Sequence, residues 1–212
     1  MGLKHHPRVV TNGLFLYYDP ANTRSYSGSG FTVNNLFSGY GCTIVNGPTY
    51  SSSNQGYISF DGSNDYAQLT LPALTNWSFS FWLYNHTIPN LTEKQLLSTN
   101  GDPTGLSMVF TYYNIWNGAS CLSTSSVAQS TWTNVVFTNV GFSSSAIYLN
   151  GALDASFNTG NQIYSGNAQL LAINSTLRNT AAYLGSFIGY NRSLSASEVL
   201  QNYNATKKRY GR

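Results

Sequence analysis

Charged side chains are scarce in this sequence of 212 residues. Asp, Glu, Lys and Arg make up 8% of it, and only seven residues are acidic; an ordinary soluble domain is roughly one quarter charged. The ten basic residues give a net charge of +3 and lie mainly toward the two ends of the chain. A nucleic-acid-binding face would interleave Lys and Arg with aromatics along one surface. We therefore expect no nucleic-acid partner, and basic tails that are solvated or dock on a partner.

Cysteines and long apolar runs are also few. Cys42 and Cys121 stand far apart, with no Cys-x-x-Cys spacing and no neighbouring histidine, which excludes a zinc site or a redox pair. We expect two buried thiols, with one disulfide as the alternative. No apolar run approaches the roughly 18 residues of a membrane span. We therefore expect no membrane partner. Residues 1–7 lack the apolar stretch of a secretory signal, so we expect no signal-directed export.

Apolar and turn-forming residues are abundant by contrast. Hydrophobic residues make up 42% of the chain and aromatics 15%, which is ample material for one core. Short alternating runs bounded by Gly, Asn, Asp, Ser and Pro recur from end to end, whereas helical periodicity is nearly absent. All-β domains of this length commonly form a single unit. The sequence therefore predicts an all-β fold of two antiparallel sheets packed as a sandwich.

The segment 77–84 (WSFSFWLY) gives the clearest strand, because large apolar residues occupy every second position. Trp82 and Tyr84 fall on its opposite face. Asn150-Gly151, between two apolar runs, predicts a two-residue type I′ turn. The residues of the strand expected to face the core are Trp77, Phe79, Phe81 and Leu83.

Near the end of the chain, Ser195 and Glu198 have the spacing of a capping box, in which each side chain satisfies a backbone donor at a helix start. This predicts one short helix from Ala196 to about Thr206. No internal repeat or linker interrupts the chain. We expect an N-terminal arm over residues 1–11 and one domain over residues 12–212.

Several motifs together resemble a known family. They include GLFLYYDPANTRSYSGSG from Gly13, ISFDGSNDY from Ile58, SFSFWLY from Ser78 and GYNRSLSASEVLQNY from Gly189, in family order. The set is similar to the laminin-G-like, concanavalin A-like jelly roll of lectins and glucanases, in the form found in structural proteins of tailed bacteriophages and in bacterial surface proteins. The resemblance covers nearly the whole chain and implies a jelly-roll sandwich.

Catalytic groups are not apparent. The glucanases of this fold need two carboxylates held roughly 5 to 10 Å apart, and the chain lacks their Glu-x-Asp-x-x-Glu pattern. Glu198 is accounted for as a helix cap. His86, and His5 and His6 in the arm, have no Ser or Cys motif beside them. We expect no enzymatic activity.

Many laminin-G-like domains bind one Ca²⁺ at the rim, so the resemblance makes calcium the candidate cofactor. Hard cations take six to eight oxygen ligands, although no calcium-loop motif of fixed spacing is present. The same side chains could instead form Asx turns. The candidate metal ligands are Asp19, Asn22, Asp61, Asn64 and Asp65.

Sugar binding is the commonest activity that the resemblance implies. It needs an exposed aromatic plane beside fixed polar groups, although aromatics of a two-sheet protein lie mostly in the core. The candidate sugar contacts are Trp82, Tyr84, Tyr112, Tyr113 and Trp116.

The resemblance leads to a functional expectation. We expect a non-enzymatic virion structural protein of a tailed bacteriophage, a capsid decoration or fibre-type subunit on the particle surface. Its partners would be other virion proteins, further copies of itself and host surface glycans. The alternative is a carbohydrate-binding module of a bacterial surface protein at the cell surface, and a hydrolase is third.

Overall fold

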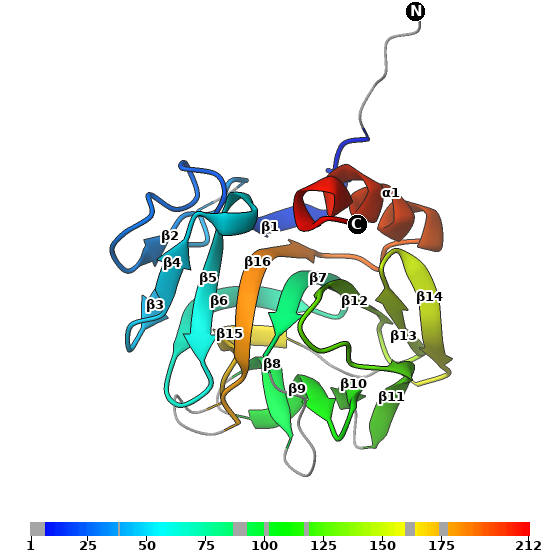
Figure 1. The fold of residues 1–212 in the computed structure, drawn as a ribbon. Helices are drawn as coiled ribbons and strands as arrows, with labels where there is room; N and C mark the ends of the chain where they lie inside the picture. Colours follow the sequence, from blue (N-terminus) through cyan, green and yellow to red (C-terminus); the bar gives the residue numbers. More distant parts are fainter. Residues whose placement is uncertain are drawn as a thin grey trace, which may run out of the picture.

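Two antiparallel sheets, each of eight strands, pack face to face as a sandwich (Figure 1). This confirms the all-β prediction and the jelly-roll architecture expected from the sequence. The computed structural model describes residues 7–37, 39–86, 93–99, 102–116, 119–159, 164–173 and 178–212.

The first sheet has the order β14-β13-β12-β7-β16-β5-β4, and β1 pairs with β16 beyond the end of β5. At its centre, the neighbours β12–β7, β7–β16 and β16–β5 come from distant parts of the sequence, as in a jelly roll. Its strands are β1 (Leu14–Tyr18), β4 (Thr49–Ser51), β5 (Tyr57–Asp61), β7 (Asn76–Asn85), β12 (Trp132–Val140), β13 (Ser144–Leu149), β14 (Ala152–Phe157) and β16 (Ala181–Tyr190).

The second sheet has the order β11-β10-β9-β8-β15-β6-β3-β2. Its strands are β2 (Thr32–Val33), β3 (Cys42–Val45), β6 (Tyr66–Leu74), β8 (Lys94–Thr99), β9 (Asp102–Val109), β10 (Tyr112–Trp116), β11 (Ser120–Ser126) and β15 (Tyr164–Leu170). The helical elements outside the sheets are η1 (Ser53–Gln55), α1 (Ala196–Thr206) and η2 (Lys207–Tyr210).

The core between the sheets is aromatic and fully enclosed. The side chains predicted to face it from β7 all have 0% exposure, and Phe79 stacks on Phe187 with ring centroids 5.6 Å apart. Cys42 and Cys121 are buried and are not joined by a disulfide, which confirms the expectation of buried thiols. Burial raises the pKa of Cys42 to about 12, so its thiol stays protonated and unreactive.

The β13–β14 hairpin turns at Asn150-Gly151, as predicted. Both residues have positive φ, 50° and 83°, as a type I′ turn requires. Gly151 is needed for a second reason, because a Cβ there would lie 2.9 Å from the side chain of Tyr203 in α1.

The edges of the two sheets meet at β14 and β11. The Asp154 carboxylate of β14 accepts hydrogen bonds from the backbone N–H groups of Thr124 (2.6 Å) and Ser125 (3.2 Å) in β11. A side chain of one sheet thus satisfies edge amides of the other.

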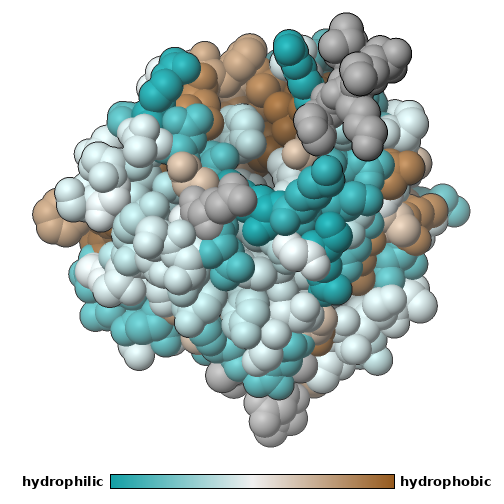
Figure 2. Space-filling view, turned by 45° about the horizontal axis from the view of Figure 1, so that its top comes forward, coloured by the Kyte–Doolittle hydropathy of each residue, from teal (hydrophilic) through white to brown (hydrophobic). Residues whose placement is uncertain are grey.

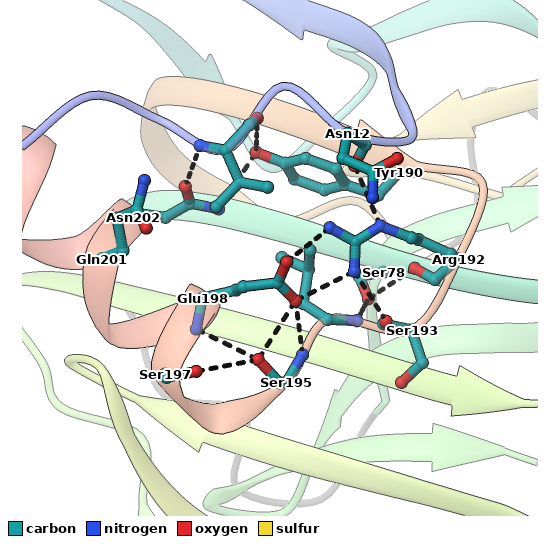
Figure 3. A network of polar contacts seen from close by, with 12 residues as sticks. Asn12, Ser78, Tyr190, Arg192, Ser193, Ser195, Ser197, Glu198, Gln201 and Asn202 are labelled. Carbon is teal, nitrogen blue, oxygen red and sulfur yellow. Dashed lines mark hydrogen bonds and ion pairs between the residues drawn. The ribbon is translucent and has the colours of Figure 1, made fainter.

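Helix α1 begins at the predicted capping box (Figure 3). Glu198 also receives two hydrogen bonds from the Arg192 guanidinium, of 2.9 and 2.6 Å. This guanidinium, more than the cap itself, lowers the pKa of Glu198 to about 2. The helix start is therefore fixed to the end of β16. No helix among the described residues is long and apolar enough to cross a membrane.

The N-terminal segment is clamped onto α1 and β16 (Figure 3). Val10 N–H donates to Asn202 Oδ1 (2.8 Å), and Tyr190 Oη donates to the Val10 carbonyl (3.0 Å). Gln201 Nε2 also donates to the Arg8 carbonyl (2.8 Å). The contacts of the domain thus extend into the predicted arm as far as Arg8, whereas His5 and His6 lie outside the described residues.

Candidate functional site

A row of three tyrosines crosses the outer face of the first sheet. Tyr183 of β16 lies directly opposite Tyr84 of β7, and Tyr84 lies opposite Trp132 of β12. Tyr57 of β5 stacks on the other side of Tyr183. Directly opposed residues share one face of a sheet, so the antiparallel register brings Tyr183, Tyr84 and Trp132 together. Tyr57 lies two residues along β5 from Ser59, which is the direct partner of Tyr183. We call Tyr57, Tyr84 and Tyr183 the tyrosine row.

The rings of the row are nearly parallel. The centroids of Tyr57 and Tyr183 are 4.1 Å apart with 25° between planes, and those of Tyr183 and Tyr84 are 5.3 Å apart at 19°. All three side chains are half-buried. His86 packs beside the row, with its ring edge-on to the central Tyr183 at 4.1 Å and to Tyr84 at 5.7 Å. Burial lowers the pKa of His86, so the imidazole is neutral at pH 7.

Trp132 forms the floor beside the row. Its ring centroid lies 5.8 Å from that of Tyr57 and 5.7 Å from that of Tyr84, and the residue is 5% exposed. Its indole Nε1 has no hydrogen-bond partner among the described residues. The Arg212 guanidinium is held at the start of β12 by the Trp132 carbonyl (2.9 Å) and Thr131 Oγ1 (2.9 Å).

The row and its neighbours bring together aromatic rings, phenol hydroxyls, a neutral imidazole and a guanidinium. These groups suit non-covalent binding of a polyhydroxylated ligand, since they provide apolar contact area together with hydrogen-bond donors. The side chains of the row include no carboxylate, whereas glycoside hydrolysis uses a carboxylate pair.

Two of the five predicted sugar contacts are instead buried. Trp82 is 1% exposed, because Tyr210 stacks on it at 4.1 Å and Tyr203 at 5.8 Å, and its Nε1 donates to Thr206 Oγ1. Tyr113 is 0% exposed, and its hydroxyl accepts a hydrogen bond from Asn85 in the core. Neither ring face is available to a sugar. For Trp82 the physical reason is that α1 and η2 cover part of the outer face of the sheet.

The other three predicted contacts are divided between the sheets. Tyr84 belongs to the tyrosine row, while Tyr112 and Trp116 are half-buried on β10 in the second sheet. Sequence reasoning missed Tyr57, Tyr183 and Trp132 as members of the row. Their strands were partly recognisable, but the register that aligns them was not.

The predicted metal ligands occupy two separate turns. Asp61 Oδ1 accepts hydrogen bonds from the backbone N–H groups of Ser63 (2.8 Å), Asn64 (3.3 Å) and Asp65 (3.4 Å). These bonds lower the pKa of Asp61. The second carboxylate of this turn, that of Asp65, accepts a hydrogen bond from the Asp61 N–H (3.1 Å). This is the Asx-turn alternative that the sequence left open.

The first turn is satisfied in the same way. Asp19 Oδ1 accepts from the Ala21 N–H (3.1 Å) and forms an ion pair with Arg209, and Asn22 Oδ1 accepts from the Arg24 N–H (3.0 Å). The bonded oxygens of these side chains are thus accounted for by Asx turns and an ion pair, without a bound ion. Within the described part of the chain, no three His, Cys, Asp or Glu side chains are grouped to hold a metal.

Similar folds occur in solved structures of low sequence identity. The receptor-binding domain of botulinum neurotoxin type G has a TM-score of 0.69 at 18% identity, covering 91% of this chain and 51% of that one. The binding domain of Paraclostridial Mosquitocidal Protein 1 has 0.71 at 15%, covering 91% and 52%. Trypanosoma rangeli sialidase has 0.71 at 14%, covering 95% and 34%. The chain thus spans about half or less of these proteins, and at such identity the likeness shows the fold alone.

Comparison with curated protein sequences gives no match. The family model described as the concanavalin A-like lectin/glucanases superfamily, of laminin G type, matches residues 61–200. This stretch runs from the end of β5 into α1 and is more than half of the chain. The chain therefore belongs to the concanavalin A-like lectin/glucanases superfamily.

Proposed function

We propose that this protein is a non-catalytic, glycan-binding display domain that works as a capsid decoration or fibre-type subunit on the virion of a tailed bacteriophage. The tyrosine row is the observation that carries the binding part of this proposal. It is a half-buried group of aromatics on the outer face of a lectin-like sandwich, with the His86 imidazole packed against it and the Arg212 guanidinium bonded to the neighbouring Trp132 carbonyl.

The lectin-like fold supports recognition over catalysis. Two of the similar solved structures are described as binding domains, one of a neurotoxin and one of a mosquitocidal protein. The sialidase is an enzyme of which this chain matches about one third. The scarcity of charged residues also supports a display role, since a neutral polar surface attracts few nonspecific binding partners. In Figure 2, pale residues of weak hydropathy cover much of one face.

The virion part of the proposal rests on the ordered motifs that resemble phage structural proteins. The domain would work there as a homo-oligomer beside other virion proteins, which is the usual arrangement of such subunits. A carbohydrate-binding module of a bacterial surface protein is the alternative, and it would use the same tyrosine row.

Alanine at Tyr183 is expected to weaken glycan binding about tenfold, because the central ring of the row contacts both neighbours and aromatic anchors contribute most binding energy. A glycan array would first identify a ligand, and calorimetric titration would then compare the wild type with Tyr183→Ala. Tyr66→Ala, at a half-buried tyrosine of β6 in the other sheet, is the matched control and should bind as the wild type does. An array without any hits, or equal losses in both variants, would refute binding at the row.

The location has its own test. Antibodies against the protein and mass spectrometry of density-purified phage particles should both detect it in intact virions. The number of copies per particle should be a multiple of the order of the symmetry axis on which the protein assembles. Recovery of the protein only from bacterial cell envelopes would disprove the virion assignment while leaving the glycan assignment standing.

A further inference from the structure

A cleft separate from the tyrosine row lies where the C-terminal segment passes β1. Figure 1 shows β1 and the helical C-terminal segment side by side at one end of the sandwich. The cleft has a volume of about 350 Å³, within the range of roughly 300 to 1,000 Å³ that is usual for small-ligand sites. Its lining residues are Tyr17, Asp19, Ala205, Thr206, Lys208 and Arg209.

One wall of the cleft is rigidly built around Arg209. Its Nη2 donates to the carbonyls of Gly56 (2.6 Å) and Gly185 (2.9 Å), and its Nη1 pairs with Asp19. The two charged side chains are only 13% and 14% exposed. The guanidinium is therefore a fixed structural element of the wall, and Asp19 is held in one place beside the opening.

Asp19 keeps one oxygen available. Its Oδ1 accepts the bonds from Arg209 and from the Ala21 N–H, whereas Oδ2 accepts none from the described part of the chain. A partly buried carboxylate oxygen is a strong acceptor for a ligand hydroxyl. This leaves a fixed hydrogen-bond acceptor at the cleft.

The cleft also has an excess of positive charge. Lys208 is exposed and forms no ion pair with an acidic residue in the regions that the structure describes. Lys208 and Arg209 against Asp19 leave a net charge of one positive unit in the lining. Burial first, and then the charge of Asp19, raise the pKa of Tyr17, so its phenol remains a hydrogen-bond donor at neutral pH. Figure 2 shows strongly hydrophilic residues gathered near the middle of the face that carries this end of the molecule.

We propose that this cleft binds the carboxylate group of an acidic saccharide. Lys208 supplies the cationic contact and Tyr17 a phenol donor, while Asp19 accepts from a neighbouring sugar hydroxyl and thereby distinguishes a saccharide from a simple anion. The cleft shares no residue with the tyrosine row. Ligand binding at one of the two sites can therefore be disproved without affecting the proposal for the other.

The test uses the full chain and two matched probes, trigalacturonate and its fully methyl-esterified form, which differ in charge but hardly in shape. In NMR titrations, trigalacturonate should shift the backbone amides of residues 17–19 and 205–209, and the ester should bind about tenfold more weakly or not at all. Equal binding of the two probes, no binding of the acid, or shifts elsewhere would overturn the proposal.

Two lysine variants separate a specific contact from general attraction. Lys208→Gln should lower the trigalacturonate affinity about tenfold. Lys207→Gln removes the same charge one residue away, where the ammonium lies over the Tyr203 ring at 5.3 Å and not in the cleft, and it should change the affinity less than twofold. Equal losses in both variants would contradict the assignment. Tyr183→Ala should leave trigalacturonate binding intact, which distinguishes this site from the tyrosine row.

Discussion

Replacing Tyr210 by alanine is expected to lower the free energy of unfolding by about 3 to 5 kcal/mol, the usual cost of removing a large buried aromatic side chain. The ring is 4% exposed and stacks on Trp82 at 4.1 Å, with the Trp132 ring 4.8 Å away. Alanine would leave a void between two indoles that nothing nearby can fill. Urea unfolding followed by tryptophan fluorescence measures the loss and reports the changed environment of both indoles.

Two comparisons make this result specific. Tyr210→Phe keeps the ring and should retain most of the stability. Leu200→Ala changes an apolar residue on the exposed side of α1, at 47% exposure, and should alter stability by no more than about 0.5 kcal/mol. If Tyr210→Ala were as mild as Leu200→Ala, the C-terminal segment would not be a stable cover of the sheet.

The second large effect is expected at Arg209. Arg209→Met should cost up to about 3 kcal/mol, because removing one partner of a largely buried ion pair leaves the other charge uncompensated. Asp19 would lose its guanidinium, and the carbonyls of Gly56 and Gly185 would lose a donor. Chemical denaturation at neutral pH measures the change.

A double variant tests the cause. Arg209→Met combined with Asp19→Asn removes both charges and should recover part of the lost stability. Arg24→Met changes an exposed residue in the loop that follows Asp19. It serves as the control for the loss of one positive charge. A double variant no more stable than Arg209→Met alone would show that the unpaired carboxylate is not the source of the cost.

The fold could be predicted from local patterns. Alternation over residues 77–84 identified a core face that is fully buried, and Asn150-Gly151 and Ser195 to Glu198 identified a turn and a helix start that the structure contains. Each of these features depends on neighbours within a few residues, so a single sequence is enough to find it.

The candidate site could be predicted only in part. Trp82 and Tyr84 share one face of β7, yet only Trp82 is covered, because Tyr203 and Tyr210 return over it from the far end of the chain. The ion pair of Asp19 with Arg209 likewise joins the two ends of the chain. Strand register and long-range packing decide these outcomes, and neither leaves a local signal in the sequence.

The carboxylate of Asp154 that bridges β14 and β11 has a consequence for assembly. Exposed strand edges are where a second protein adds a strand of its own, but here the amides of Thr124 and Ser125 are already occupied by a charged side chain. An incoming strand would have to displace that charge before it could form a ladder. The Asp154 carboxylate therefore disfavours the addition of a foreign strand along this part of β11, and contacts made here would be expected to use side chains and loops.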